Sequence, residues 1–212
     1  AGFVGGDGAT HMGAFGITYL RCVPNLILMA PSNLKECKDM LSTAYQYPGP
    51  AAVRYPRGSG NEQDLIEPTK TLPIGKAQYC RRGQQVALLA FGNAVNAAIE
   101  AGNTLNATVI NMRFIKPLDT DLLKEVSAHH DLLVTLEENS TMGGAGSAVC
   151  EHLHQLHLQT PVLQIGIQDE FIEHSSTEKQ QKQNQLTAPQ IILSVKKKLK
   201  NIASEFNLST ME

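Results

Sequence analysis

Short apolar runs alternate with polar, proline-rich or glycine-rich segments over residues 1–60. The run at residues 25–30 lies between two prolines, which is typical of a short buried strand. Ser32 follows it and is placed to cap a helix that ends near the proline-rich residues 47–50. The apolar face of that helix is predicted to consist of Leu34, Cys37, Met40, Leu41 and Ala44. In all, this part of the chain is predicted to hold one or two helices and three strands, at residues 3–4, 25–30 and 51–55.

From residue 76 onward, apolar runs of strand length alternate with segments of helical period. Strands are predicted at residues 76–80, 85–91, 108–112, 132–136 and 161–165. Helices are predicted at residues 93–101, 119–129, 146–158 and 187–202. Gly102 would close the first of these helices and Asp119 would cap the second. This alternation predicts an α/β structure with a mainly parallel sheet flanked by helices.

Residues 61–73 are polar, contain proline and show no apolar period, so they are predicted to form a linker. The linker separates a first unit, residues 1–60, from a second unit, residues 74–203, and residues 204–212 are predicted to be a frayed tail. A parallel sheet normally has more strands than the first unit supplies, so we interpret this unit as part of a domain. The start at Ala1, without Met or a leader, is interpreted as an internal cut.

Composition narrows the class of protein. The 212 residues are 42% hydrophobic and 18% charged with a net charge of −2, as in an ordinary globular protein, which argues against a nucleic-acid partner. No apolar run approaches the ~20 residues that a membrane span requires. The four cysteines are far apart without a C-x-x-C pair, which favours reduced thiols in the cytoplasm over disulfides or a zinc site.

The densest group of candidate functional residues lies at residues 5–15, where four glycines surround Asp7 and His11. Glycines beside ionisable side chains are typical of a binding or catalytic site. The alternative is a polar surface turn in which His11 has no function. Asp7 and His11 are four residues apart, so the acid could orient the imidazole, or both could bind hydroxyl groups of one ligand. Eleven residues cannot enclose a ligand, so other elements must complete the site.

Arg54 and Arg57 flank the end of the strand predicted at residues 51–55. Open α/β sheets bind ligands at the carboxyl ends of their strands. A guanidinium there suits a bidentate grip on a phosphate or carboxylate. A salt bridge at an interface is the alternative.

Two further motifs indicate structure rather than chemistry. Gly143–Gly146 precedes a helix but lacks the spacing of a dinucleotide motif and the lysine of a P-loop, and Glu137 and Glu138 beside it would repel a phosphate. We therefore predict that this turn allows close packing of a helix on the sheet, or a contact between domains. A surface helix rather than a metal site is predicted for His152, His154 and His157.

Several segments carry a resemblance to a known family. They are Gly6–Phe15 (GDGATHMGAF), Tyr19–Asn25 (YLRCVPN), Met29–Ser32 (MAPS), Ala52–Gly58 (AVRYPRG), Arg113–Asp119 (RFIKPLD), Glu137–Asn139 (EEN) and Met142–Ser147 (MGGAGS). Together they resemble the 1-deoxy-D-xylulose-5-phosphate synthase family, whose members are thiamine-diphosphate-dependent relatives of transketolase. The resemblance covers residues 1 to about 175, and residues 175–185, rich in Gln and Lys, depart from it.

The resemblance implies a fold and a place in a longer enzyme. Members have a diphosphate-binding domain, a pyrimidine-binding domain and a C-terminal domain. This chain resembles the end of the second domain, at residues 1–60, and all of the transketolase C-terminal domain, at residues 74–203. The full-length enzyme, with the missing N-terminal domains, would be a cytoplasmic homodimer.

The resemblance also implies a reaction. The family joins pyruvate, with loss of CO2, to glyceraldehyde 3-phosphate, the first step of the non-mevalonate isoprenoid pathway and a source of thiamine. His11 would be catalytic, by bonding the reacting oxygen or moving a proton; Asp7 would bind a substrate hydroxyl, and Arg57 would hold the acceptor's phosphate. The full-length enzyme uses thiamine diphosphate and Mg²⁺, but the motifs that bind them are missing here. We therefore expect no cofactor-binding or metal-binding residue in this chain, and no activity from the fragment alone.

Two alternatives remain at this point. One is a non-catalytic binding or assembly module. The other is a subunit of a split transketolase-type enzyme, such as a relative of the pyruvate dehydrogenase beta chain. The segments at residues 19–25 and 52–58 argue against the second alternative.

Overall fold

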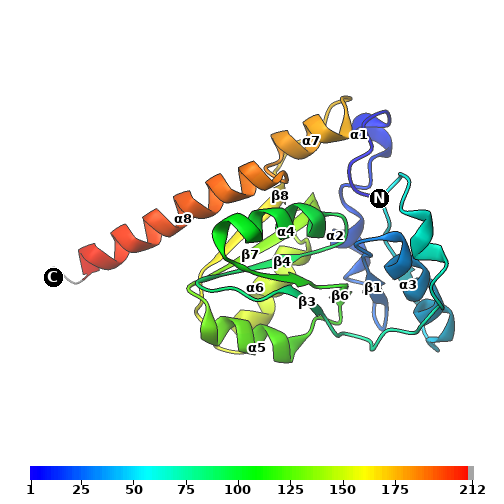
Figure 1. Ribbon diagram of the computed structural model, residues 1–212, viewed down its shortest axis with the longest axis horizontal. Coiled ribbons are helices and arrows are strands. Elements are labelled where there is room, and N and C mark those ends of the chain that lie inside the picture. The colour runs from blue at the N-terminus through cyan, green and yellow to red at the C-terminus, as the bar shows by residue number, and fades with distance from the viewer. Residues whose placement is uncertain (210–212) are drawn as a thin grey trace.

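The structure is a computed structural model that describes residues 1–209, apart from the side chains of Leu65 and of residues 205–209. The strands within residues 1–209 form two sheets, one of three strands and one of five (Figure 1). The smaller sheet has the order β2-β1-β6. In it, β1 (Ile27–Met29) and β2 (Ala51–Val53) are parallel, and β6 (Phe114–Lys116) pairs antiparallel with β1.

The larger sheet has the order β3-β5-β4-β7-β8. Its strands are β3 (Gln78–Arg81), β4 (Val86–Ala90), β5 (Thr108–Asn111), β7 (Leu132–Ser140) and β8 (Val162–Ile167). All neighbours are parallel except the edge strand β3, which runs antiparallel to β5. The prediction of a mainly parallel sheet is confirmed.

Helices cover both faces of the larger sheet because its central strands are apolar on both sides. The helices after the linker are α4 (Ala94–Leu105), α5 (Thr120–His129), α6 (Ala145–Gln155), α7 (Thr177–Gln183) and α8 (Ala188–Ser209). Leu88 of β4 packs in a cluster with α4 and α8, whereas Leu89 packs in a second cluster with α5 and α6. Neighbouring residues of a strand point to opposite faces, so one buried strand serves both cores.

The N-terminal part contains two short helices, α1 (Gly8–His11) and α2 (Gly16–Leu20), followed by α3 (Leu34–Gln46) and the 3₁₀ helix η1 (Glu62–Leu65). Phe3 and Val4 are buried, but they do not form the strand predicted at residues 3–4. The Phe3 N–H donates to the Glu138 side chain at 3.3 Å instead of to a neighbouring strand. The third strand of the smaller sheet is β6, from the second half of the chain.

The start and the buried face of α3 also differ from the prediction. Asn33, not Ser32, is the N-cap, because its side chain accepts from the Glu36 N–H at 2.8 Å. The Ser32 N–H and hydroxyl both donate to the Glu36 carboxylate at 2.8 Å, as in a capping box. Met40 is buried, as predicted, in an apolar cluster with strands of the smaller sheet, whereas Leu41 is 51% exposed.

In the second half, the ends of two helices differ from the prediction and one predicted cap is confirmed. Gly102 lies inside α4, where a Cβ would come within 2.3 Å of the Val109 side chain, and the helix ends instead before Asn106 in the left-handed conformation. The N-cap at Asp119 is confirmed, since its side chain accepts from the Leu122 N–H. α8 continues to Ser209, beyond the end predicted near residue 202, and residues 210–212 of the predicted tail lie outside the described residues.

Candidate active site

Residues 5–15 form a compact loop around α1 that buries two of its apolar side chains and exposes a third, Phe15. Met12 and Ala14 are buried in the core beside α4, whereas His11 is exposed and Asp7 is half-buried. The loop thus anchors itself through its apolar residues and presents its ionisable side chains outward. Because its buried side chains hold the backbone in place, this glycine-rich segment can keep His11 and Asp7 in fixed positions at the surface.

The end of β7 holds this loop through a series of hydrogen bonds. The Ser140 N–H donates to the Ala14 carbonyl at 2.7 Å, and the Asn139 side chain accepts from the Ile17 N–H at 3.0 Å. One residue earlier, the Glu138 carboxylate accepts from the Phe3 N–H. The EEN segment singled out in the sequence is therefore the platform on which the loop lies.

The Arg54 side chain is partly buried beneath the same loop. Its guanidinium donates to the Gly13 carbonyl at 2.7 Å and to the Glu138 carbonyl. Burial lowers the pKa of Arg54, and the nearby carboxylates of Glu138 and Glu137 oppose that shift. Of the two arginines predicted to hold a ligand, this one ties the end of β2 to the loop and to β7, and its guanidinium is engaged by two backbone carbonyls.

Arg57 and Asp7 are brought together. An Arg57 guanidinium nitrogen lies 3.3 Å from an Asp7 carboxylate oxygen, and the two side chains are 75% and 31% exposed. An ion pair this exposed is weakened by solvent, so Arg57 can exchange its carboxylate partner for an anionic ligand.

His11 is held differently. Its Nδ1 pairs with the Thr10 hydroxyl at 2.8 Å, while the Asp7 carboxylate faces Arg57. Among the described residues, Asp7 does not orient the imidazole, although both side chains belong to the same loop. The structure thus joins two of the three predicted site residues directly, and the third lies at the other end of α1.

The segment before α7 covers the other side of the loop, as Figure 1 shows for α1 and α7. A Cβ at Gly5 would lie 2.1 Å from the Ser175 carbonyl oxygen, and a Cβ at Gly8 would lie 2.2 Å from the His174 ring. Both glycines are needed for this close approach, and Gly8 also has a φ of +58°. His174 is the site neighbour that sequence reasoning missed; the two glycines were the signal that something packs there.

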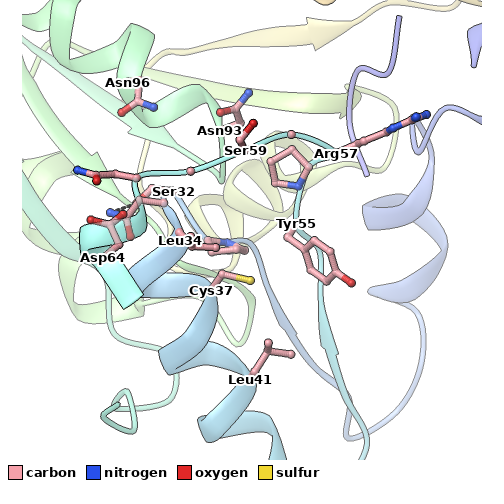
Figure 2. Close-up of a pocket in the computed structure, with 16 residues that line it drawn as sticks. Ser32, Leu34, Cys37, Leu41, Tyr55, Arg57, Ser59, Asp64, Asn93 and Asn96 are labelled. Atoms are coloured by element: carbon pink, nitrogen blue, oxygen red, sulfur yellow. Dashed lines mark hydrogen bonds between the residues drawn. The ribbon is translucent and has the colours of Figure 1, made fainter. Parts of the chain in front are cut away.

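A cavity of about 690 Å³ lies beside the site, between α3 and the residues after β2. Its apolar wall includes Leu34, Cys37 and Leu41, and Arg57 stands at its rim. Figure 2 shows the Arg57 side chain directed away from these three residues. Asp7 and His11 are not among the residues that line the cavity.

The N–H groups of the glycine-rich turn at residues 143–146 donate to a carboxylate of the chain itself. The Glu137 carboxylate accepts from the Ala145 and Gly146 N–H groups, both at 2.7 Å, and so occupies the start of α6. Burial raises the pKa of Glu137 to about 7. A Cβ at Gly146 would lie 2.5 Å from the Thr135 hydroxyl, so the predicted close packing of helix on sheet is confirmed.

Other features bear on metals and membranes. His152 on α6 uses its Nδ1 for the Ala148 carbonyl at 3.1 Å. Within residues 1–209, no group of three or more His, Cys, Asp or Glu side chains is arranged to hold a metal ion. In the same part of the chain, no helix is both long and apolar enough to cross a bilayer. The four cysteines are free thiols.

Comparison with protein-family profiles gives two matches. Residues 1–63 match the profile described as "Transketolase, pyrimidine binding domain", and residues 75–191 match "Transketolase, C-terminal domain". This chain belongs to the transketolase family. β1 and β2 of the smaller sheet lie in the segment that matches the pyrimidine-binding domain, whereas β6 and all strands of the larger sheet lie in the segment that matches the C-terminal domain.

Individual relatives of this transketolase-family chain carry a more specific name. Proteins from Methylobacillus flagellatus, Hahella chejuensis and Shewanella oneidensis, each called 1-deoxy-D-xylulose-5-phosphate synthase, are 51%, 50% and 55% identical over 94%, 95% and 82% of this chain. The chain spans about a third of the length of these relatives, at 32%, 31% and 28%.

A solved structure is similar as well. A chain described as "Split gene transketolase, inactive beta4 tetramer" matches with a TM-score of 0.78 and 26% identity. The match covers 90% of this chain and 63% of that chain. The arrangement of the two sheets is therefore shared with a known member of the family.

Proposed function

We propose that this chain is the C-terminal part of a 1-deoxy-D-xylulose-5-phosphate synthase. The full-length enzyme would join pyruvate, with loss of CO2, to glyceraldehyde 3-phosphate in the first step of the non-mevalonate isoprenoid pathway. The observation that carries this proposal is about half identity to synthases over nearly the whole chain. The Asp7–Arg57 pair supports it, because a sugar phosphate needs groups for both its hydroxyls and its phosphate.

The three site residues have separate roles in this proposal. Arg57 binds the phosphate of the acceptor, since a phosphate dianion attracts a guanidinium more strongly than the single charge of Asp7 does. Asp7, released from Arg57, accepts a hydrogen bond from a substrate hydroxyl. His11 bonds the reacting oxygen or moves a proton there, which suits an imidazole at neutral pH.

Thiamine diphosphate and Mg²⁺ do not fit the residues of this chain. The glycine-rich turn at residues 143–146, which opens α6, is filled by the Glu137 carboxylate, which would repel a diphosphate. We assign the binding of both groups to the missing N-terminal portion of the full-length protein. This chain then acts on the substrates rather than on the cofactor, and by itself it would be inactive.

The proposed domain boundaries follow the sequence. Residues 1–60 are the end of a pyrimidine-binding domain, residues 61–73 a linker, residues 74–203 the C-terminal domain and residues 204–212 a terminal segment. We further propose that the full-length enzyme is a cytoplasmic homodimer. The free thiols support the reducing compartment, and the exposed aromatic pair Phe15 and Phe171 supports an assembly that covers it.

The second candidate is the subunit of a split transketolase-type enzyme. It is favoured by the likeness to the chain described as a split gene transketolase. The higher identity to synthases favours the first proposal. The two candidates differ in substrate, because a transketolase transfers a ketol unit from a sugar phosphate and does not release CO2 from pyruvate.

The proposal is tested by incubating the full-length protein with pyruvate and glyceraldehyde 3-phosphate and measuring CO2 and 1-deoxy-D-xylulose 5-phosphate. We expect both products from the full-length protein and none from the 212-residue chain alone.

His11→Gln should lower kcat about 100-fold or more, as loss of a proton-transfer group does. His154→Gln, an exposed histidine on α6, is the matched control and should leave kcat unchanged. Equal effects of the two variants, or no CO2 release, would refute the proposal.

A further inference from the structure

The Glu138 side chain connects three separate elements at the site. It is 4% exposed, and its carboxylate accepts from the Phe3 N–H at 3.3 Å, the Asn93 side chain at 3.1 Å and the Gln181 side chain at 2.9 Å. These donors belong to the segment just before the loop, the start of α4 and the middle of α7. A buried carboxylate is tolerated only when donors surround it, so the three elements are held at one point.

The contact with the loop is close. Oε2 accepts the Phe3 N–H, and a Cβ at Gly2 would lie 2.3 Å from the same oxygen. The backbone of residues 2–3 therefore lies directly on the carboxylate. Arg54 reinforces the same point, since it bridges the Glu138 carbonyl to the Gly13 carbonyl at the far end of the loop.

The contact between Glu138 and α7 affects the segment at residues 173–175, which packs on the loop. Gln181 donates to Glu138, and its neighbour Gln180 donates to the Glu173 carbonyl at 3.0 Å. The position of α7 therefore determines the position of the segment at residues 173–175, where His174 and Ser175 press on the loop glycines. The Glu138 carboxylate thus holds the backbone at the start of the chain directly, and through α7 it also holds the segment at residues 173–175 that packs on the loop.

We propose that Glu138 is a positioning residue, which sets the geometry of Asp7 and His11 by tying their loop to α7. This inference rests on the proposed function of the site. Arg57 follows β2 rather than belonging to the loop, so it keeps its own position when Glu138 is changed. Loss of the carboxylate should therefore slow the chemical step at His11 more than it weakens binding of the phosphorylated acceptor.

The test is Glu138→Gln in the full-length protein. Glutamine keeps the size of the side chain and can still accept from Asn93 and Gln181, but its amide then meets the Phe3 N–H as donor against donor. The matched control is Glu137→Gln, which changes the same kind of buried carboxylate one residue away but on the opposite face of β7. Gln181→Ala is a milder variant that removes only the tie to α7.

Two readouts are measured, hydrogen exchange and steady-state kinetics. In Glu138→Gln, amide exchange in residues 2–14 should be about 10-fold faster while exchange in β4 is unchanged. The value of kcat should fall about 10-fold while KM for glyceraldehyde 3-phosphate changes less than about threefold. Gln181→Ala should show smaller changes in the same direction, and it carries the test if Glu138→Gln does not fold.

The outcomes are separable. Unchanged exchange in residues 2–14, an equal increase in Glu137→Gln, or a rise in KM without a fall in kcat would each overturn the positioning role. If the wild-type protein makes no product, the proposed function fails, but hydrogen exchange still decides whether Glu138 holds the loop.

Discussion

Glu137 and Glu138 are neighbours on β7 with opposite surroundings, because strand alternation sends their side chains to opposite faces of the sheet. The Glu137 carboxylate accepts from two N–H groups at the start of α6, whereas the Glu138 carboxylate accepts from donors of three elements. Burial raises the pKa of Glu137 to about 7, above the 4.5 of an ordinary glutamate. The folded protein therefore binds a proton at Glu137 more tightly than the unfolded chain does.

This difference predicts a pH dependence of stability. The stabilising contribution of protonated Glu137 is fully present below pH 4.5 and is lost as the pH rises through about 7, which amounts to about 3 kcal/mol of unfolding free energy. Chemical denaturation of wild type and Glu137→Gln at a series of pH values measures it. The wild type should lose stability relative to the variant between pH 5 and 8. A constant difference across that range would show that Glu137 is not perturbed.

At the scale of elements, α6 lies close on the sheet because its first turn contains Gly146. A Cβ there would lie 2.5 Å from the Thr135 hydroxyl and 2.9 Å from the Gln164 side chain. Thr135 is fully buried and surrounded by packed side chains, so little space is open for it to move away from a new methyl group. The cost of overpacking should therefore exceed the gain in helix propensity from replacing glycine.

Gly146→Ala is expected to lower the free energy of unfolding by about 1–3 kcal/mol. Gly58→Ala is the control, since a Cβ at that position meets nothing within 4 Å. Thermal unfolding of both variants measures the effect. A Gly146→Ala protein as stable as Gly58→Ala would mean that α6 can shift away from β7 at little cost.

Elements that carry their own signal were predictable from the sequence, and elements defined by distant partners were not. β4 and the body of β7 are buried apolar runs, and Asp119 caps α5 as its position indicates. β6 is three residues long and exists because β1 lies beside it. α7 has no apolar period, because it is packed through buried polar side chains such as Gln180.

The site shows the same division. The glycines, Asp7, His11 and Arg57 mark a site because their residue types and spacing are unusual. The Asp7–Arg57 contact and the burial of Arg54 join residues that are 50 and 84 positions from their partners, so no local pattern contains them. The packing role of residues 143–146 was predictable, because an acidic pair before a glycine-rich turn disfavours a phosphate.

At the scale of the whole molecule, the two sheets are joined by shared parts rather than by the linker alone. β6 comes from the second half of the chain and completes the smaller sheet. The Arg113 guanidinium contacts Glu36 of α3 at 2.6 Å, and the loop at residues 5–15 lies on the end of β7. The candidate site therefore depends on both halves of the chain, and the proposed enzyme needs a further portion that these 212 residues do not contain.

The most direct test of the central claim compares Arg57→Ala with wild type in the full-length protein, using glyceraldehyde 3-phosphate and unphosphorylated glyceraldehyde as acceptors. Arg82→Ala is the control, because Arg82 is an exposed arginine paired with a carboxylate far from the site. We predict that Arg57→Ala lowers kcat/KM about 100-fold for the phosphorylated acceptor, as expected for losing a charge-assisted contact, and leaves kcat/KM for glyceraldehyde unchanged. Equal losses for both acceptors, or no loss for either, would contradict the account.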